Sequence, residues 1–166
     1  MKGKRARSAE DKETRKNTIL KAAWELYEQS EGKLPTVLSI AEKTGLSKGA
    51  IYLYFKSKEE IFLSQCVYKL KEWFAAILQS VDYEKDQTAR EVATQYVRYV
   101  VDNPLVLKIT SLIKGVLEVN IDDEFVYQTK LEIAALLTSA GKMLADLIPG
   151  VTEREGTKFI LRAYSL

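Results

Sequence analysis

The sequence has no histidine and a single cysteine, which limits the catalytic and metal-binding sites that it can form. No Ser, Thr or Cys stands near a residue that would act as its base, and there is no glycine-rich phosphate loop. Neither a cysteine pair nor a cluster of carboxylates is available to hold a structural metal. The sequence therefore predicts a protein that is not an enzyme and that carries no cofactor.

The lone Cys66 cannot form a disulfide within the chain, and it lies among Phe62, Val67 and Leu70. This is the setting of a small buried hydrophobe. A redox sensor is the alternative, but the chain offers no second cysteine to resolve an oxidised thiol.

Long apolar runs are also missing. No run would span a bilayer, and residues 1–16 are charged without the apolar stretch of a secretory signal, so we expect a cytoplasmic protein with no membrane segment. With 166 residues, 46% of them hydrophobic, the chain suffices for a packed core, as one domain or as a small head fused to a larger body.

Charge is unevenly distributed, although the net charge is only +2. The opening stretch carries Lys2, Lys4, Arg5, Arg7, Lys12, Arg15, Lys16 and Lys21 against Glu10, Asp11 and Glu13. Residues 1–14 are interpreted either as a flexible basic arm that attracts phosphates and enters a groove, or as a solubilising tail.

Apolar residues recur at the helical period along the chain, which predicts an all-α fold. A first helix presents Ile19, Ala22, Ala23, Leu26 and Tyr27 on one face. A long helix is expected from 58 to about Val81, and another from Asp122 or Asp123 to Leu147, where Pro149 and Gly150 break it. Three capping-box pairs mark helix starts: Ser57 with Glu60, Thr88 with Glu91, and Thr152 with Glu155. Asn103 before Pro104 predicts an N-cap and first helical residue of a helix that ends near Gly115.

Residues 36–58 carry the strongest signal. Thr36 is a fair N-cap for one short helix, Gly45 stands where that helix must stop and reverse, and Ser47 can cap the next. An aromatic-rich run, Tyr52, Tyr54 and Phe55, is expected on the second helix. Two short helices meeting at a sharp angle form a helix-turn-helix, the motif of many DNA-reading proteins.

This stretch resembles the DNA-binding head of the TetR/AcrR family of bacterial transcriptional regulators. The family pattern is filled by Ile40, Ala41, Gly45, Ser47, Gly49, Tyr52, Phe55 and Lys58. The resemblance covers about the first third of the chain. It implies a basic arm over 1–14, a helix-turn-helix DNA-binding domain over 15–60, and a helical regulatory and dimerisation domain over 61–166. Members usually continue through one more helix, so we expect this chain to lack its last one.

The leading residues of a helix in the major groove lie closest to the base edges. The positions that match DNA contacts in the family are Thr36, Ser47, Lys48, Gly49, Tyr52, Tyr54 and Lys58. Two alternatives stay open: Tyr52 packs between helices, or Lys58 only solvates a helix end. Phe55, Ile40, Ala41 and Leu46 are assigned to the core of the head.

In the family, the body surrounds a pocket for a small molecule whose binding releases the operator. The resemblance thus implies a small hydrophobic or amphipathic effector. Candidate pocket residues are Trp73, Phe74, Tyr96, Tyr99, Phe125, Tyr127 and Met143, with plain core as the alternative for each. Without histidine, an effector held as a metal chelate by His is excluded.

Two heads related by symmetry would read a palindromic site on double-stranded DNA, so a homodimer is expected. Two apolar faces late in the chain are expected to form either the dimer interface or the core within one chain. The first face carries Ile133, Leu136, Leu137, Ala140, Leu144 and Leu147, and the second carries Phe159, Ala163 and Leu166. The sequence as a whole favours a sequence-specific, ligand-released transcriptional repressor. The alternative is a helical protein-interaction (adaptor) domain that does not bind DNA.

Overall fold

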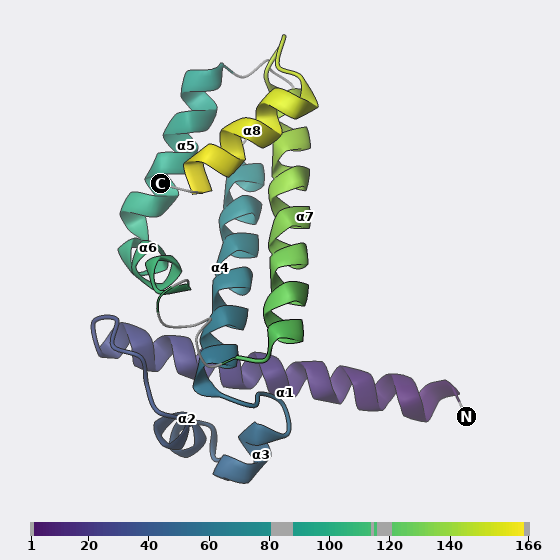
Figure 1. Cartoon of the computed structure of the whole chain (residues 1–166), viewed down its shortest axis with the longest axis vertical. Coiled ribbons are helices and arrows are strands. Elements are labelled where there is room, and N and C mark those ends of the chain that lie inside the picture. Colours follow the sequence, from purple (N-terminus) through teal and green to yellow (C-terminus); the bar gives the residue numbers. More distant parts are fainter. Residues whose placement is uncertain (1, 81–87, 114, 116–120, 165–166) are drawn as a thin grey trace. The chain divides into compact units, whose positions relative to one another are not determined.

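The computed structural model describes residues 2–80, 88–113, 115 and 121–164, and in these ranges it contains eight α-helices and no strand (Figure 1). The first four are α1 (Lys2–Gln29), α2 (Val37–Thr44), α3 (Lys48–Tyr52) and α4 (Lys58–Ser80). The others are α5 (Ala89–Asp102), α6 (Pro104–Ser111), α7 (Asp123–Leu147) and α8 (Glu153–Tyr164). The predicted all-α fold is confirmed.

The helices form two compact units. The first, here called the head, contains the described residues up to Cys66 together with those from Lys108 to Phe125. The second, the body, contains those from Val67 to Leu107 and from Val126 onwards. This division differs from the boundary expected at 60/61, because α4 passes from one unit into the other and the second half of α6 groups with the head.

The core of the head comes from the apolar faces of α1 to α4 and from the part of α6 that joins them. Its buried side chains include Ile19, Ala23, Tyr27, Ile40, Ile51, Phe62, Cys66 and Ile109. The rings of Tyr27 and Phe62 lie 5.9 Å apart between centroids. The face predicted for the first helix is therefore the buried one, apart from the half-buried Leu26.

The body has its own core, built on α4, α5, α7 and α8. Its buried members are Val67, Leu70, Trp73, Phe74, Ile77, Val92, Ile133, Leu137, Ala140, Leu144 and Ile160. Trp73 stacks on both Phe74 and Tyr99, with ring centroids 6.1 and 5.7 Å apart. Five residues of the late face on α7, namely Ile133, Leu137, Ala140, Leu144 and Leu147, are buried within the chain, which is the core alternative.

The backbone of the expected arm is helical from Lys2, where α1 begins. The physical reason lies in composition: between Gly3 and Gly32 there is no Gly or Pro, and Ala6, Ala9 and Glu10 favour helix. No helix in the described ranges is long and apolar enough to cross a membrane.

Most predicted helix boundaries are confirmed. The capping boxes of Thr88 with Glu91 and of Thr152 with Glu155 form, and α7 covers the predicted range. Val81 lies outside the described residues, and the long helix is described to Ser80.

Two capping predictions need correction. Ser57 caps the Glu60 N–H, but the Glu60 carboxylate accepts from the Lys56 N–H at 2.6 Å, one residue earlier than a capping box requires. The Asn103 side-chain amide donates to the Tyr99 carbonyl at 2.9 Å. It therefore caps the C-terminal end of α5 and not the start of α6. Pro104 does begin α6, which ends at Ser111; Ile113 and Gly115 beyond it have π-helical backbone, close to the predicted end near Gly115.

Candidate functional site

The first helix of the motif, α2, is held in place at both ends by local hydrogen bonds. The Thr36 hydroxyl accepts from the Ser39 N–H at 3.1 Å. At the other end Gly45 has φ +68°, a conformation that costs Gly nothing, and the next N–H, of Leu46, bonds back to the Ala41 carbonyl at 3.1 Å. The chain therefore leaves α2 in a tight reversal.

The second helix, α3, begins two residues after that reversal. The Ser47 hydroxyl accepts from the Ala50 N–H at 3.1 Å, as predicted for an N-cap. The helix ends at Tyr52, however, so Tyr54 and Phe55 lie beyond it and the prediction that they belong to it is wrong. The N–H groups of Tyr54 and Phe55 both bond to the Ile51 carbonyl, at 2.9 and 3.1 Å, which closes the helix in a turn.

The two helices have one buried and one open side. Ile40, Ala41, Ile51 and Phe55 are at most 3% exposed, which confirms the core role predicted for Ile40, Ala41 and Phe55, whereas Leu46 is only half-buried. On the open side stand Thr36, Ser47, Lys48, Gly49 and Tyr52, all exposed. Five of the seven predicted DNA contacts are therefore accessible to a partner; these five residues are here called the reading surface.

Lys48 and Tyr52 contact each other across one turn of α3. The Lys48 ammonium lies 5.8 Å from the centroid of the Tyr52 ring, a cation–π geometry. Tyr52 is 44% exposed, so its ring is not packed between helices.

The remaining two predicted contacts are less accessible than these five. Tyr54 and Lys58 are half-buried. The Lys58 ammonium lies 3.8 Å from the Glu59 carboxylate, and this negative charge weakens the attraction of Lys58 for an anion.

An ion pair between α1 and α2 supports the orientation of the motif. The Lys43 ammonium lies 2.9 Å from the Glu25 carboxylate, and the hydrogen bond and charge of Lys43 lower the pKa of Glu25 below its ordinary value. Both groups are partly solvated, so the pair orients α2 more than it stabilises the head.

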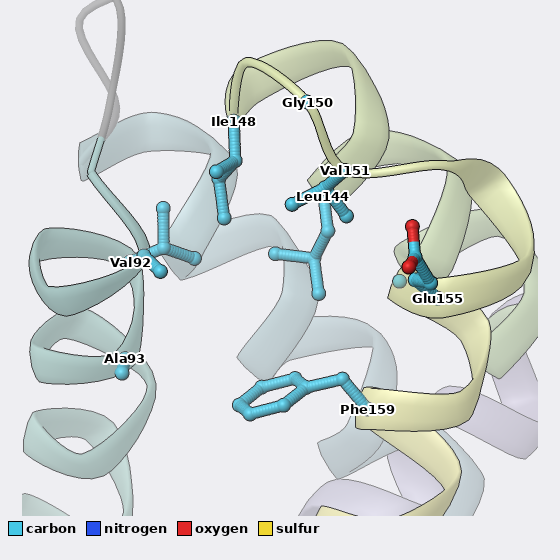
Figure 2. Close-up of a pocket in the computed structure, with 10 residues that line it drawn as sticks. Val92, Ala93, Leu144, Ile148, Gly150, Val151, Glu155 and Phe159 are labelled. Atoms are coloured by element: carbon cyan, nitrogen blue, oxygen red, sulfur yellow. The ribbon is translucent and has the colours of Figure 1, made fainter.

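The body contains a cavity of about 290 Å³ between α5 and the α7–α8 turn. It is lined by Ala89, Val92, Ala93, Leu144, Ile148, Gly150, Val151, Glu155, Gly156 and Phe159. Figure 2 shows Val92 and Ala93 of α5 on one side of this cavity and Leu144, Val151 and Phe159 on the other. Its walls are almost entirely apolar.

Comparison with known protein families decides the identity. Residues 19–64 match the model "Bacterial regulatory proteins, tetR family", and residues 68–166 match "Tetracyclin repressor-like, C-terminal domain". The second match alone covers more than half of the chain. The chain belongs to the TetR family. Proteins of this family are non-enzymatic transcriptional regulators, which agrees with the predicted absence of catalysis.

Relatives of this TetR-family chain match its N-terminal part. It is 43% identical over 54 residues to the HTH-type transcriptional regulator YerO of Bacillus subtilis, a match that covers 32% of this chain and 19% of YerO. It is 34% identical over 79 residues to the nucleoid occlusion factor SlmA of Alteromonas mediterranea, covering 48% of this chain and 40% of SlmA. The matched region thus spans less than half the length of either relative.

Among solved structures, the transcriptional regulator FadR of Bacillus subtilis, crystallised in complex with stearoyl-CoA, superimposes with a TM-score of 0.48 at 19% identity. That superposition covers 89% of this chain and 81% of FadR.

Of the seven ligand residues predicted for this TetR-family body, the six whose side chains the structure describes do not line the cavity. Trp73 and Phe74 are buried, Tyr99 and Met143 pack partly buried against the same core cluster, and Tyr127 is 58% exposed. Phe125 belongs to the head, and the side chain of Tyr96 lies outside the described residues.

Sequence reasoning missed the cavity because most of its lining residues are small or aliphatic and they come from three separate segments. The one local signal was the Pro149-Gly150 break that ends α7, since the turn it creates supplies part of the wall.

Proposed function

We propose that this protein is a homodimeric, cytoplasmic transcriptional repressor that binds a palindromic operator in double-stranded DNA. A small hydrophobic or amphipathic effector bound in the body releases it. The observation that carries the DNA part is the two-sided helix-turn-helix, with Ile51 and Phe55 buried beneath α3 while Lys48, Gly49 and Tyr52 stay exposed.

Each exposed group has a role in this proposal. Lys48 donates to guanine acceptors or to a phosphate, and Gly49 allows the backbone to approach the base edges. Tyr52 donates its hydroxyl to a phosphate while its ring orients the Lys48 ammonium. Ser47 and Thr36 flank these groups, and Tyr54 and Lys58 act at the edge, where their partial burial limits them to phosphates.

The decisive experiment is a gel shift at controlled salt, with an operator obtained by selection from random duplexes. Lys48→Ala and Tyr52→Phe are expected to weaken binding by about 1–3 kcal/mol each if they contact bases or charged phosphates. Their melting temperatures should stay close to that of the wild type, because neither side chain is buried. Lys142→Ala, at an exposed position of α7 in the body, is the matched charge control. Full binding by both reading-surface variants would overturn the proposed docking.

The adaptor alternative has a separate test. A regulator binds random duplex DNA at low salt and loses affinity steeply as salt rises. The reason is that the protein's Lys and Arg side chains release counterions from the phosphates, and added salt opposes that release. An adaptor domain shows neither property. Sedimentation of the full chain with and without DNA tests the proposed homodimer.

A further inference from the structure

The body cavity is a feature that the helix-turn-helix does not explain. Its volume of about 290 Å³ is close to the lower limit of natural small-molecule sites, which begin near 300 Å³. An apolar cavity of about 150 Å³ in another protein is known to hold benzene, so roughly twice that volume suits a bicyclic aromatic or a hydrocarbon of similar bulk.

The lining supplies shape and very little polarity. Val92 and Leu144 are buried members of the core of the body, and Ile148 packs against them. Phe159 is 48% exposed although it lines the cavity, and its ring points toward α5 (Figure 2). An occupant that covered this ring would remove apolar surface from water, which is the main driving force available here.

Charge in the lining works against an anionic occupant. Among the described residues that line the cavity, Glu155 alone is charged. Its carboxylate already accepts hydrogen bonds from the N–H and the hydroxyl of Thr152, at 2.9 and 2.6 Å, and these bonds lower its pKa, so it is ionised at neutral pH. None of the lining residues that the structure describes offers a cation to a ligand carboxylate or phosphate.

We propose that the cavity between α5 and the α7–α8 turn binds a compact, uncharged, largely apolar molecule of bicyclic size, and that carboxylates and phosphates are rejected. Ligand binding at this cavity stands by itself, whereas its effect on DNA rests on the proposed function. The aromatic cluster of Trp73, Phe74 and Tyr99 is core and lies outside the site.

Two opposite walls of the cavity suit it to regulation. Ile148, Gly150 and Val151 belong to the turn between α7 and α8, and Gly150 has φ +82° there. Ala93 belongs to α5, on the opposite wall (Figure 2). A ligand in the cavity therefore contacts both walls at once and fixes the spacing between α5 and this turn.

The test uses the full chain and two probes of matched shape. 2-Naphthalenemethanol is uncharged, and 2-naphthoate is its anionic counterpart. Titration calorimetry at neutral pH is expected to show saturable binding of the alcohol at one site per chain. The carboxylate should bind at least about tenfold more weakly, because its charge would be buried without a partner and beside Glu155. Equal or tighter binding of the carboxylate, or no saturable binding of the alcohol, overturns the proposal.

Two variants assign the binding to this cavity. Ala93→Phe fills the space from the α5 wall, and Phe159→Ala removes the exposed ring; each should weaken binding of the alcohol at least about tenfold. Ala75→Phe, at an exposed position on α4, is the matched control and should bind as the wild type does. Circular dichroism melting verifies that each variant is folded. Unchanged binding by both folded cavity variants places the ligand elsewhere and overturns the proposal.

The regulatory consequence is measured separately. A gel shift with saturating alcohol tests whether occupancy lowers DNA affinity. Binding without an effect on DNA contradicts the ligand release in the proposed function and leaves the cavity assignment intact. DNA binding without any binding of the alcohol contradicts the cavity assignment alone.

Discussion

Lys108 on α6 donates a hydrogen bond from its ammonium to the backbone carbonyl of Glu31, at 2.7 Å, across 77 positions of sequence. The aliphatic part of the same side chain lies over Gly32, where an added Cβ would stand 2.7 Å from the Lys108 Cδ. The contact satisfies a carbonyl just past the end of α1, close to the entry into the helix-turn-helix. It attaches the second half of α6 to the head.

Gly32 is the more sensitive partner in this contact. Its φ of +84° is a conformation that L side chains resist, so Gly32→Ala should destabilise the head by about 1–2 kcal/mol. Lys108→Ala should cost less, on the order of 1 kcal/mol, because the hydrogen bond is solvent-exposed.

A double-mutant cycle by urea denaturation separates strain from crowding in that pair. If the Lys108 stem crowds the new methyl group, Gly32→Ala will cost less in the Lys108→Ala background than in the wild type. Equal costs in both backgrounds would mean that backbone strain alone opposes the substitution.

Gly141 and Gly156 are predicted to be needed for the close crossing of α7 and α8. A Cβ on Gly156 would overlap the Gly141 carbonyl oxygen, and a Cβ on Gly141 would overlap the backbone of Thr157. Because backbone cannot yield as a side chain does, Gly141→Ala or Gly156→Ala should destabilise the body by about 1–3 kcal/mol. Thermal melting checks this, and an unchanged melting temperature for both would contradict the crossing described here.

Gly49 should behave in the opposite way. No neighbour crowds a Cβ at this position, where the nearest atom is the Ser47 Oγ at 3.9 Å, and Ala is the better helix former. We expect Gly49→Ala to stabilise the head by roughly 0.5–1 kcal/mol. The same change should weaken operator binding if the backbone of α3 approaches the bases. Melting and gel shift on the same variant test both halves, and a gain in stability with unaltered operator affinity would remove close approach as the reason for Gly49.

Burial raises the pKa of the Cys66 thiol from 9.0 to about 12 and that of the Tyr27 hydroxyl from 10.0 to about 12. Both groups are neutral when protonated, and the folded state holds these protons more tightly than the unfolded state does. Their stabilising effect is therefore complete below pH 9 and is lost as the pH rises from 9 toward 12. Melting temperatures measured between pH 7 and pH 11 should fall over the upper part of that range.

Tyr27→Phe offers a clean variant for this alkaline effect. The buried Tyr27 hydroxyl has no hydrogen-bond partner among the described residues, so its removal should not lower stability at pH 7. The variant should also lose part of the alkaline destabilisation. Alkylation of Cys66 by iodoacetamide should be slow in the native protein and fast in urea, as its complete burial requires. Rapid native alkylation would contradict that burial.

Local hydrogen bonds explain why much of the architecture was predictable. Thr36 with Ser39, Ser47 with Ala50, and Thr152 with Glu155 each join residues three positions apart, so a short stretch of sequence contains both partners. The left-handed Gly45 is equally local. For this reason the starts of α2, α3 and α8, and the exposed residues of the reading surface, could be predicted from the sequence.

The predictions that failed or stayed incomplete involve residues whose partners are distant in sequence, or residues with two possible partners nearby in sequence. α3 ends at Tyr52, and Phe55 beyond it is buried, which is a property of the assembled head. The aromatic residues proposed for the ligand site recur at helical spacing, which is equally typical of core residues. Trp73, Phe74 and Tyr99 stack on one another within the core.

By itself, the sequence determined that this chain is helical, where most of its helices begin, and which short motif faces outward, since each depends on backbone groups and side chains within one or two turns. Only the tertiary structure decided that Lys108 reaches Glu31, that Cys66 lies beneath the Ile109 carbonyl at 3.9 Å, and that α5 and the α7–α8 turn leave a cavity between them. These features depend on how helices far apart in the chain pack, and packing is set by the shapes of many side chains together.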